Sequence, residues 1–161
     1  MEHRQYVTQY TEYTSLEELT PADRSLMEQA IVVAQSAYAP YSGFRVGAAL
    51  QLANGEIVCG NNQENAAYPS GMCGERVAMF SASAQYPGVA FENLAIYACS
   101  DKISVDDVVT PCGSCRQVMA EYFHAQAKDF RIILKGENSL VIIFESIDGL
   151  LPLMFSPKHL L

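Results

Sequence analysis

Hydrophobic and polar positions divide the chain into segments with helical spacing and segments with strand spacing. The first helical segment follows Thr20 and Pro21, a residue type that caps helices and a proline suited to the first helical position. This helix should end before Pro40, because proline disfavours helical backbone in the residue that precedes it. Its apolar residues repeat at a spacing that places them on one face: Leu26, Ala30, Ile31 and Ala34.

Shorter apolar runs predict the strands of one sheet. Residues 46–52 and 56–60 fit two strands joined by Asn54-Gly55, a strong hairpin turn signal. Residues 93–99, 130–134 and 140–144 are also strand-like, while helices are expected through Cys73 and over residues 115–127. This order predicts an α/β fold with a mixed sheet covered by helices. The first fifteen residues are polar and rich in tyrosine, and they fit a short edge strand and a loose tail equally well.

The length and composition are those of one folded domain. The chain has 161 residues, of which 50% are hydrophobic, and this is enough to bury one core. We therefore expect a single domain over residues 1–161, with residues 1–19 as either a short edge strand or a loose N-terminal tail.

Charge and hydropathy argue against several classes of partner. The net charge of −8 at pH 7 argues against a nucleic-acid polymer as substrate, because a phosphate backbone requires a basic surface. No apolar run is long enough to cross a bilayer, and no N-terminal segment resembles a signal peptide. We therefore expect a cytoplasmic protein without a membrane partner.

Three of the five cysteines have the spacing of metal ligands. Cys112 and Cys115 form a C-x-x-C pair that can bind one metal ion from the first turn of a helix, and Cys73 is the natural source of a third thiolate. Three protein ligands are typical of a catalytic zinc, which keeps its fourth position for water. The odd number of cysteines fits a reducing compartment, and the remaining Cys59 and Cys99 are expected to be buried free thiols.

Charged residues near these cysteines predict a hydrolytic centre. Glu75 lies two residues after Cys73, and its expected role is proton transfer to and from a metal-activated water. Three thiolates around one divalent cation carry a net negative charge. Arg76 and Arg116 are therefore expected to donate to the thiolates and offset this charge, with Arg76 the stronger candidate.

Both groups of cysteines lie where helices should begin. Ser70 is expected to cap the helix that runs through Cys73, and Thr110 is expected to cap a helix with Pro111 at its first position. Because the N-terminal end of a helix stabilises negative charge, these positions favour thiolates.

Several motifs, in one order along the chain, resemble those of a known family. Cys73-Gly74-Glu75 and Pro111-Cys112-Gly113-Ser114-Cys115 form the C-x-E and P-C-x-x-C signature of zinc deaminases. The segments 39–50, 62–69 and 151–155 extend the match, so most of the chain resembles the small cytidine deaminases with a three-cysteine zinc site. The resemblance implies a three-layer α/β/α fold with a five-stranded mixed sheet. Gly74 departs from the more typical alanine, and it is expected to weaken the helix by up to about 1 kcal/mol and to loosen the site.

The resemblance also implies a reaction. Cytidine and 2′-deoxycytidine would be hydrolysed to uridine and 2′-deoxyuridine with release of ammonia, as in pyrimidine salvage. One Zn²⁺ per subunit would be bound by the three cysteines. Glu75 would take a proton from water, deliver it to ring N3 and help to protonate the departing amine.

Further residues are assigned to substrate binding by the resemblance. Asn62 and Glu64 match the pair that contacts the ribose, and an amide with a carboxylate is chemically suited to a sugar 3′-hydroxyl. Phe44 matches the aromatic residue that packs on the pyrimidine.

Three other positions imply an oligomer. Ala66 and Tyr68 match positions that reach the 5′-hydroxyl of a ligand bound to a neighbouring subunit, and Phe155 matches an aromatic residue that covers a neighbouring site. The resemblance therefore implies a homotetramer with shared active sites.

Two alternatives remain open at this stage. One is a deaminase for another aminopyrimidine nucleoside, such as an antibiotic of the blasticidin type, although the ribose-reading pair disfavours it. The other is a zinc-stabilised binding module without catalysis, which would require a fourth protein ligand or the loss of Glu75 as proton carrier.

Overall fold

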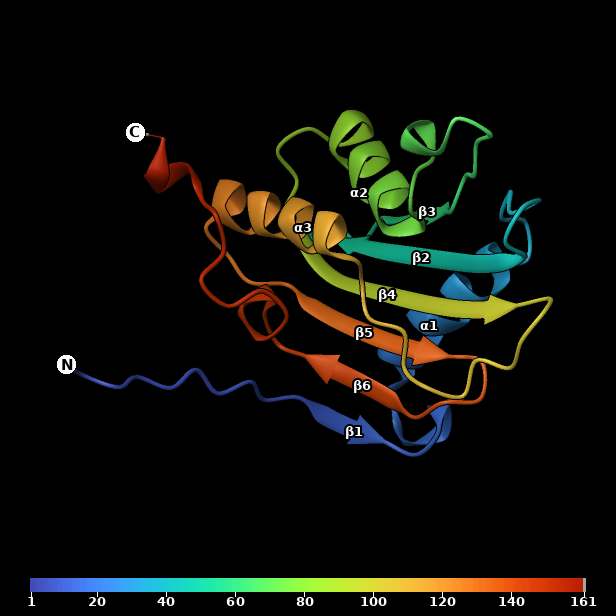
Figure 1. The fold of residues 1–161 in the computed structure, drawn as a ribbon, viewed down its shortest axis with the longest axis horizontal. Coiled ribbons are helices and arrows are strands. Elements are labelled where there is room, and N and C mark those ends of the chain that lie inside the picture. The colour runs from blue at the N-terminus through green and yellow to red at the C-terminus, as the bar shows by residue number, and fades with distance from the viewer. Residues whose placement is uncertain (161) are drawn as a thin grey trace.

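The computed structural model describes residues 1–160 and has three layers, with one sheet between helices (Figure 1). The sheet has the strand order β1-β6-β5-β4-β2-β3, in which β4 and β5 are parallel and all other neighbours are antiparallel. Its strands are β1 (Thr11–Tyr13), β2 (Phe44–Leu52), β3 (Ile57–Asn61), β4 (Phe91–Ser100), β5 (Arg131–Gly136) and β6 (Val141–Phe144).

Helices cover both faces of the sheet. α1 (Pro21–Ala34) lies on one face, and α2 (Gly74–Gln85) and α3 (Gly113–Gln126) lie on the other (Figure 1). A buried apolar cluster fills each interface; Met79 and Met119 belong to the α2 and α3 side, and Met27 belongs to the α1 side. The α/β fold with helices on both faces of a mixed sheet is therefore confirmed.

The local signals for the first helix are also confirmed. The Thr20 hydroxyl accepts a hydrogen bond from the Asp23 backbone N–H at 3.1 Å, so it satisfies one of the free donors at the start of α1. Leu26 and Ala30 are buried against the sheet, and the helix ends six residues before Pro40 at Ala34.

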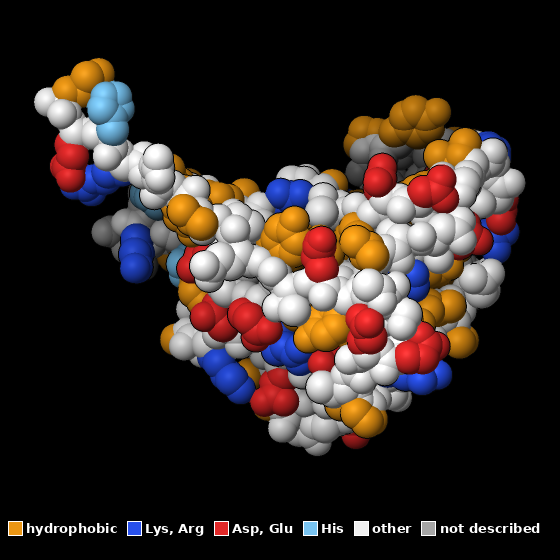
Figure 2. Space-filling view, turned by 90° about the horizontal axis from the view of Figure 1, so that it is seen from below, with side chains coloured by type: hydrophobic (Ala, Val, Ile, Leu, Met, Phe, Trp, Pro, Cys, Tyr) orange, Lys and Arg blue, Asp and Glu red, His pale blue; other side chains and the backbone are white. Residues whose placement is uncertain are grey.

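The sheet has six strands rather than the expected five, because part of the N-terminal segment pairs with it. Thr11, Glu12 and Tyr13 lie antiparallel to β6 and form the edge strand β1. Before this strand, the Thr8 hydroxyl donates to the carbonyl of Gly149 at 3.2 Å. The N-terminal segment projects from the body beyond these contacts (Figure 1). Charges of both signs are interspersed on the face seen in Figure 2.

The expected helix caps at Ser70 and Thr110 are wrong. Ser70 belongs to a separate 3₁₀ turn (Tyr68–Ser70), and the N-cap residue of α2 is Cys73. Likewise, Cys112 is the N-cap residue of α3, so Pro111 precedes the helix. Each metal-binding motif therefore places a cysteine at the N-cap position of a helix.

The two cysteines outside the motifs differ in exposure. Cys99 is buried in β4, as expected, but Cys59 is exposed in β3. The expectation for Cys59 was wrong because β3 is an edge strand whose alternate residues, Ile57 and Cys59, face solvent while Val58 faces the core.

Two glycines allow helices to approach the sheet closely. A Cβ atom at Gly47 in β2 would lie 2.0 Å from the backbone oxygen of Ala30 in α1. A Cβ atom at Gly60 in β3 would lie 2.4 Å from the backbone nitrogen of Ala78 in α2. These contacts fix α1 and α2 against opposite faces. None of the helices in residues 1–160 has the length and apolar character needed to cross a membrane.

Candidate active site

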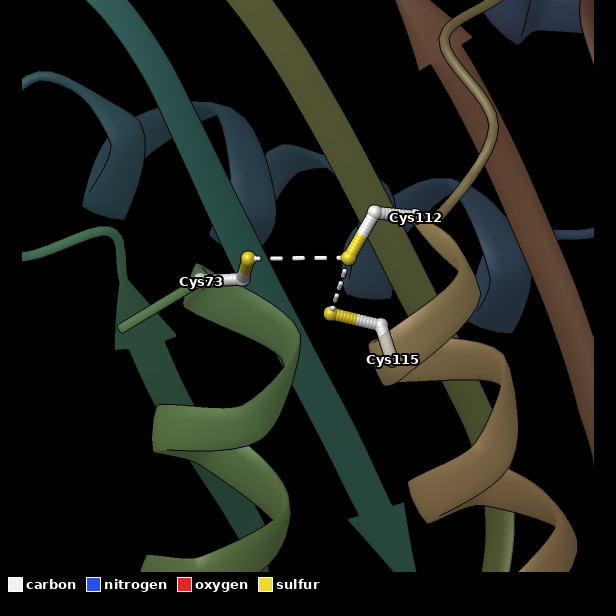
Figure 3. Close-up of side chains that lie close together, drawn as sticks. All are labelled: Cys73, Cys112 and Cys115. Carbon is white, nitrogen blue, oxygen red and sulfur yellow. Dashed lines mark hydrogen bonds between the residues drawn. The ribbon is translucent and has the colours of Figure 1, made fainter. Parts of the chain in front are cut away.

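The N-terminal ends of α2 and α3 bring three cysteines together (Figure 3). The Sγ atoms of Cys73 and Cys112 are 3.9 Å apart, and those of Cys112 and Cys115 are 3.4 Å apart. All three sulfur atoms lie within 4.8 Å of one another. Cys73 is the N-cap residue of α2, Cys112 is the N-cap residue of α3, and Cys115 lies in the first turn of α3, so packing of the two helices assembles the cluster.

The geometry of the cluster fits zinc. A tetrahedral zinc with Zn–S bonds of about 2.3 Å holds its sulfur ligands about 3.8 Å apart, close to the observed separations. Within residues 1–160, no histidine, aspartate or glutamate joins the three thiols as a fourth member of the cluster. Cys73, Cys112 and Cys115 therefore form a zinc-binding triad with three ligands, the number typical of a catalytic site.

Glu75 lies beside the triad in an environment that favours its protonated form. Its side chain is buried in the first turn of α2, and Oε2 has no hydrogen-bond partner. Burial is the largest cause that raises the pKa of Glu75 to about 7, and the negative charge of Cys73 contributes in the same direction. A buried carboxylate oxygen without a partner is costly, so this atom is available to a group that enters the site.

Charges are unevenly distributed among the thiols. The pKa of Cys73 is lowered to about 5. Its interaction with the Cys115 side chain is the largest cause, and the Arg76 guanidinium also favours the thiolate. The same interaction raises the pKa of Cys115. Cys73 thus carries the negative charge most readily, at the start of a helix where a thiolate is stabilised.

The two neighbouring arginines have different roles. Arg76 donates from Nη2 to Cys73 Sγ at 3.5 Å, as expected. Arg116 instead donates to the carbonyls of Pro111 and Leu150, both at 2.7 Å, and to the Thr110 hydroxyl at 2.8 Å. The expected contact of Arg116 with a thiolate was therefore wrong, because its guanidinium donates to two backbone carbonyls and the Thr110 hydroxyl instead.

Gly74 is required by a close approach rather than being a loose point in the site. A Cβ atom there would lie 2.8 Å from the Val46 backbone oxygen and 3.2 Å from Asn61 Cα. The expectation that glycine loosens the site is not supported, since the start of α2 packs directly on β2 and β3.

A cavity of about 610 Å³ opens beside the triad. This is within the usual range for a small-molecule site. Residues from the start of β2, from α2, from the loop between β3 and α2 and from the loops before β2 and α3 line it. The expected residues among them are Phe44, Asn62, Glu64, Tyr68, Cys73, Glu75, Arg76 and Cys112.

The proposed ribose pair is fixed by backbone groups. Asn62 accepts from the Val46 N–H at 2.7 Å and donates to the Phe44 carbonyl at 2.9 Å. Glu64 accepts from the Tyr41 N–H at 2.8 Å and from the Ser42 N–H at 3.3 Å. The Ser42 hydroxyl also donates to Glu64 and accepts from the Phe44 N–H. Both side chains are therefore oriented in advance at the rim of the cavity.

Some predicted residues lie outside this cavity, and one residue that lines it was not predicted from the sequence. Ala66 and Phe155 are exposed and do not line it, whereas Tyr68 lines it but is 80% exposed. Ser42 lines the cavity and was not predicted as a site residue. Its signal was its place in the turn directly before Phe44.

Comparisons with known proteins agree with the geometry. A family described as "Cytidine and deoxycytidylate deaminase zinc-binding region" matches residues 20–129. The cytidine deaminase of Halalkalibacterium halodurans is 39% identical over 124 residues, which are 77% of this chain and 89% of that protein. The cytidine deaminase of Sporosarcina psychrophila is 40% identical over 127 residues, which are 78% of this chain and 85% of that protein.

Solved structures give the same relationship. The cytidine deaminase of Burkholderia pseudomallei has a TM-score of 0.72 and 37% identity, and the match covers 85% of this chain and 100% of that chain. The cytidine deaminase of Mycobacterium tuberculosis has a TM-score of 0.62 and 30% identity, over 82% of this chain and 95% of that chain.

Proposed function

The chain belongs to the cytidine and deoxycytidylate deaminase family and is a zinc-binding cytidine deaminase, and from this premise we propose that Glu75 is its proton carrier. The reaction is the hydrolysis of cytidine to uridine and ammonia, and we extend it to 2′-deoxycytidine. The observation that carries the proposal is the buried, unpartnered Oε2 atom of Glu75 beside the three thiols.

In the proposed mechanism, the protein residues transfer protons and balance charge around a water that the metal activates. When bound, zinc acts as a Lewis acid that makes a nucleophile available from water at neutral pH. Glu75 accepts the proton that this water loses and delivers it to ring N3, which makes C4 more electrophilic. It then transfers the second proton of the water to the departing amine, so that cytidine and water give uridine and ammonia. Arg76 offsets the negative charge of the thiolates through Cys73.

Replacing Glu75 by glutamine tests the proton-transfer role. Glu75→Gln keeps the size of the side chain, so the variant should retain zinc and fold. Turnover should fall at least about 100-fold, because an amide cannot carry the proton. The loss of the cytosine chromophore and the release of ammonia measure the reaction. The control is Glu56→Gln, an exposed residue of the β2–β3 hairpin, which should keep full activity. Near-normal turnover in Glu75→Gln would refute the assignment.

We further propose that Phe44, Asn62 and Glu64 bind the nucleoside. Phe44 would pack on the pyrimidine, while Asn62 and Glu64 would contact the ribose 3′-hydroxyl. Although backbone groups hold both polar side chains, an amide nitrogen has two donor hydrogens and each carboxylate oxygen has more than one acceptor site, so further bonds are available. Loss of discrimination between cytidine and 2′,3′-dideoxycytidine in Glu64→Gln would support this role, and unchanged discrimination would exclude it.

We also propose a homotetramer in which neighbouring subunits share sites. The exposed positions of Ala66, Tyr68 and Phe155 support contact with a second subunit. An active monomer in sedimentation at assay concentration would refute sharing. A role in pyrimidine salvage in the cytoplasm is our remaining proposal, and the five free cysteines are compatible with such a reducing compartment.

A further inference from the structure

One peptide group at the rim of the cavity is held from both sides. The carbonyl of Tyr41 accepts a hydrogen bond from Lys102 Nζ at 2.6 Å. The N–H of Ser42, which belongs to the same peptide group, donates to Glu64 Oε2 at 3.3 Å. A cation and an anion therefore bind the two ends of a single peptide dipole.

Lys102 is well placed to orient this peptide group. It lies in the loop that follows β4, and its backbone N–H donates to Ser100 Oγ at 3.2 Å. The aliphatic part of its side chain covers Gly43, because a Cβ atom at Gly43 would lie 3.2 to 3.4 Å from Lys102 Cε, Cγ and Cδ. Gly43 has a φ angle of +68°, a conformation that favours glycine, so the turn and the lysine stem fit together.

The neighbouring residue of this loop adds a second anchor. The Asp101 N–H donates to the Gly43 carbonyl at 3.0 Å, and the Asp101 carboxylate pairs with Arg45 at 2.6 Å. These contacts hold the backbone of the turn whatever residue stands at position 102. Removal of the Lys102 ammonium alone should therefore leave the turn folded and release only the Tyr41–Ser42 peptide group.

The charge of Lys102 also acts on Glu64. The hydrogen bond from the Ser42 hydroxyl is the largest cause that lowers the pKa of Glu64. The backbone N–H groups of Tyr41 and Ser42 and the positive charge of Lys102 act in the same direction. Hydrogen bonds in such a chain polarise one another, so a cation on the carbonyl strengthens donation by the N–H of the same peptide group.

We propose that Lys102 is a positioning residue that orients Glu64 for the nucleoside ribose through the Tyr41–Ser42 peptide group. This inference rests on the proposed ribose role of Glu64. Lys102 touches neither the zinc ligands nor Glu75 in this arrangement, so its effect is on substrate binding and not on the chemical step. The loop after β4 continues to Cys112, and thus one connection serves both the metal site and the ribose site.

A double-mutant cycle tests the inference. Lys102→Met keeps the aliphatic stem over Gly43 and removes the ammonium, and it should raise KM for cytidine about fivefold with kcat unchanged, the effect of losing one hydrogen bond. Lys102→Arg, which retains a donor, should restore much of the affinity. If Lys102 acts through Glu64, the double variant with Glu64→Gln should have the KM of Glu64→Gln alone.

The control is Lys128→Met, because Lys128 is exposed and pairs with Glu92 at the opposite end of β4, so this variant should leave KM unchanged. Thermal unfolding of each variant separates a loss of fold from a loss of orientation. An unchanged KM in Lys102→Met, or additive effects in the double variant, would overturn the inference while Glu64 kept its ribose role. An unchanged KM in Glu64→Gln would overturn both the ribose role of Glu64 and the positioning role of Lys102.

Discussion

At the residue scale, Arg76 and Arg116 illustrate how similar side chains near one metal site serve different purposes. Arg76 reaches Cys73 Sγ, so its charge acts on a ligand. Arg116 is held by backbone carbonyls of Pro111 and Leu150, so it joins the start of α3 to the C-terminal segment. Replacement of Arg76 should therefore affect the metal site, whereas replacement of Arg116 should affect stability.

Replacing Arg76 should impair the metal centre. Arg76→Gln removes the positive charge beside Cys73, and loss of such a partner typically costs ten- to a hundredfold in metal affinity or activity. We expect about a tenfold loss in one of these quantities, with the melting temperature of the zinc-loaded protein nearly unchanged. Metal content and kcat measured on the same sample test this. Wild-type values for both would show that the guanidinium does not compensate the thiolate charge.

Replacing Arg116 should instead impair stability. Arg116→Met leaves the Pro111 and Leu150 carbonyls without their donor, and the free energy of unfolding should fall by roughly 2 kcal/mol. Denaturant unfolding of the zinc-loaded protein measures the loss, and kcat per bound zinc should remain close to that of the wild type. A variant that unfolds like the wild type but turns over slowly would assign Arg116 to the chemistry after all.

The site residues differ in how well the sequence predicts them. The three thiols and Glu75 could be named from short local motifs, and spacing along a helix start is enough to bring Cys112 and Cys115 together. The meeting of Cys73 with Cys112, 39 positions away, depends instead on the packing of α2 and α3. The partner of Arg116 at Leu150 is 34 positions away, and no local pattern reveals it. The same is true of Lys102, whose carbonyl partner Tyr41 is 61 positions away.

At the element scale, the metal should join α2 to α3. Each helix begins at a zinc ligand, and within residues 1–160 the two helices make far fewer contacts with each other than α2 makes with β2 and β3. Metal bound only by the folded protein adds to its stability.

Removal of zinc should therefore lower the melting temperature as well as activity. A metal held at about a thousand times its Kd adds roughly 4 kcal/mol, which corresponds to about 10 °C for a domain of this size. Chelation followed by calorimetry tests the expectation. Cys115→Ser serves as control, because a protein that has already lost the site should show no further decrease on chelation. An equal decrease in both proteins would mean that the chelator acts elsewhere.

The approach of α1 to the sheet gives a second prediction at this scale. Gly47→Ala would place a methyl group 2.0 Å from the Ala30 carbonyl oxygen, and the free energy of unfolding should fall by about 3 kcal/mol or more as α1 is displaced. Gly113→Ala is the matched control, since its Cβ would meet nothing within 4 Å. Denaturant titration compares the two. If both variants were equally stable, α1 would not be fixed by this contact.

The sequence predicts the elements better than their ends. Apolar patterning located α1 to α3 and β2 to β6, because the helices bury one face and the central strands β2, β4 and β5 contain runs of consecutive buried residues. The caps of α2 and α3 were misplaced, since the cysteines that bind metal themselves occupy the boundary positions. β1 has only three residues and depends on pairing with β6, far along the chain, so its own pattern was too short to decide between strand and tail.

At the scale of the whole molecule, two expected site residues do not line the cavity of their own chain. Phe155 lies in the C-terminal segment, is 55% exposed and stacks on His159 at a ring distance of 5.3 Å. Ala66 is exposed beyond the cavity rim. Burial of such an aromatic side chain against a second copy would give it a role in that copy's site.

Mixing two impaired variants tests whether sites are shared. If the proposed roles hold, a Glu75→Gln subunit would lack the proton carrier but retain Phe155, whereas a Phe155→Ala subunit would retain Glu75 but could not cover its neighbour's site. In randomly assembled hybrids, about a quarter of all sites would combine an intact Glu75 with an intact Phe155 from the adjoining subunit. We therefore expect cytidine turnover after dissociation and reassembly of the mixture to exceed the mean of the two separate variants.

The assay distinguishes sharing from independent sites because of this excess. Each variant dissociated and reassembled alone provides the control for damage during mixing. If each subunit contained a complete site, reassembly would only average the two activities, since no new combination of residues would arise. An average without excess, in a mixture shown by sedimentation to contain hybrid oligomers, would assign Phe155 to its own subunit or to no site. Excess turnover would make the oligomer, rather than the single chain, the smallest unit with a complete active site.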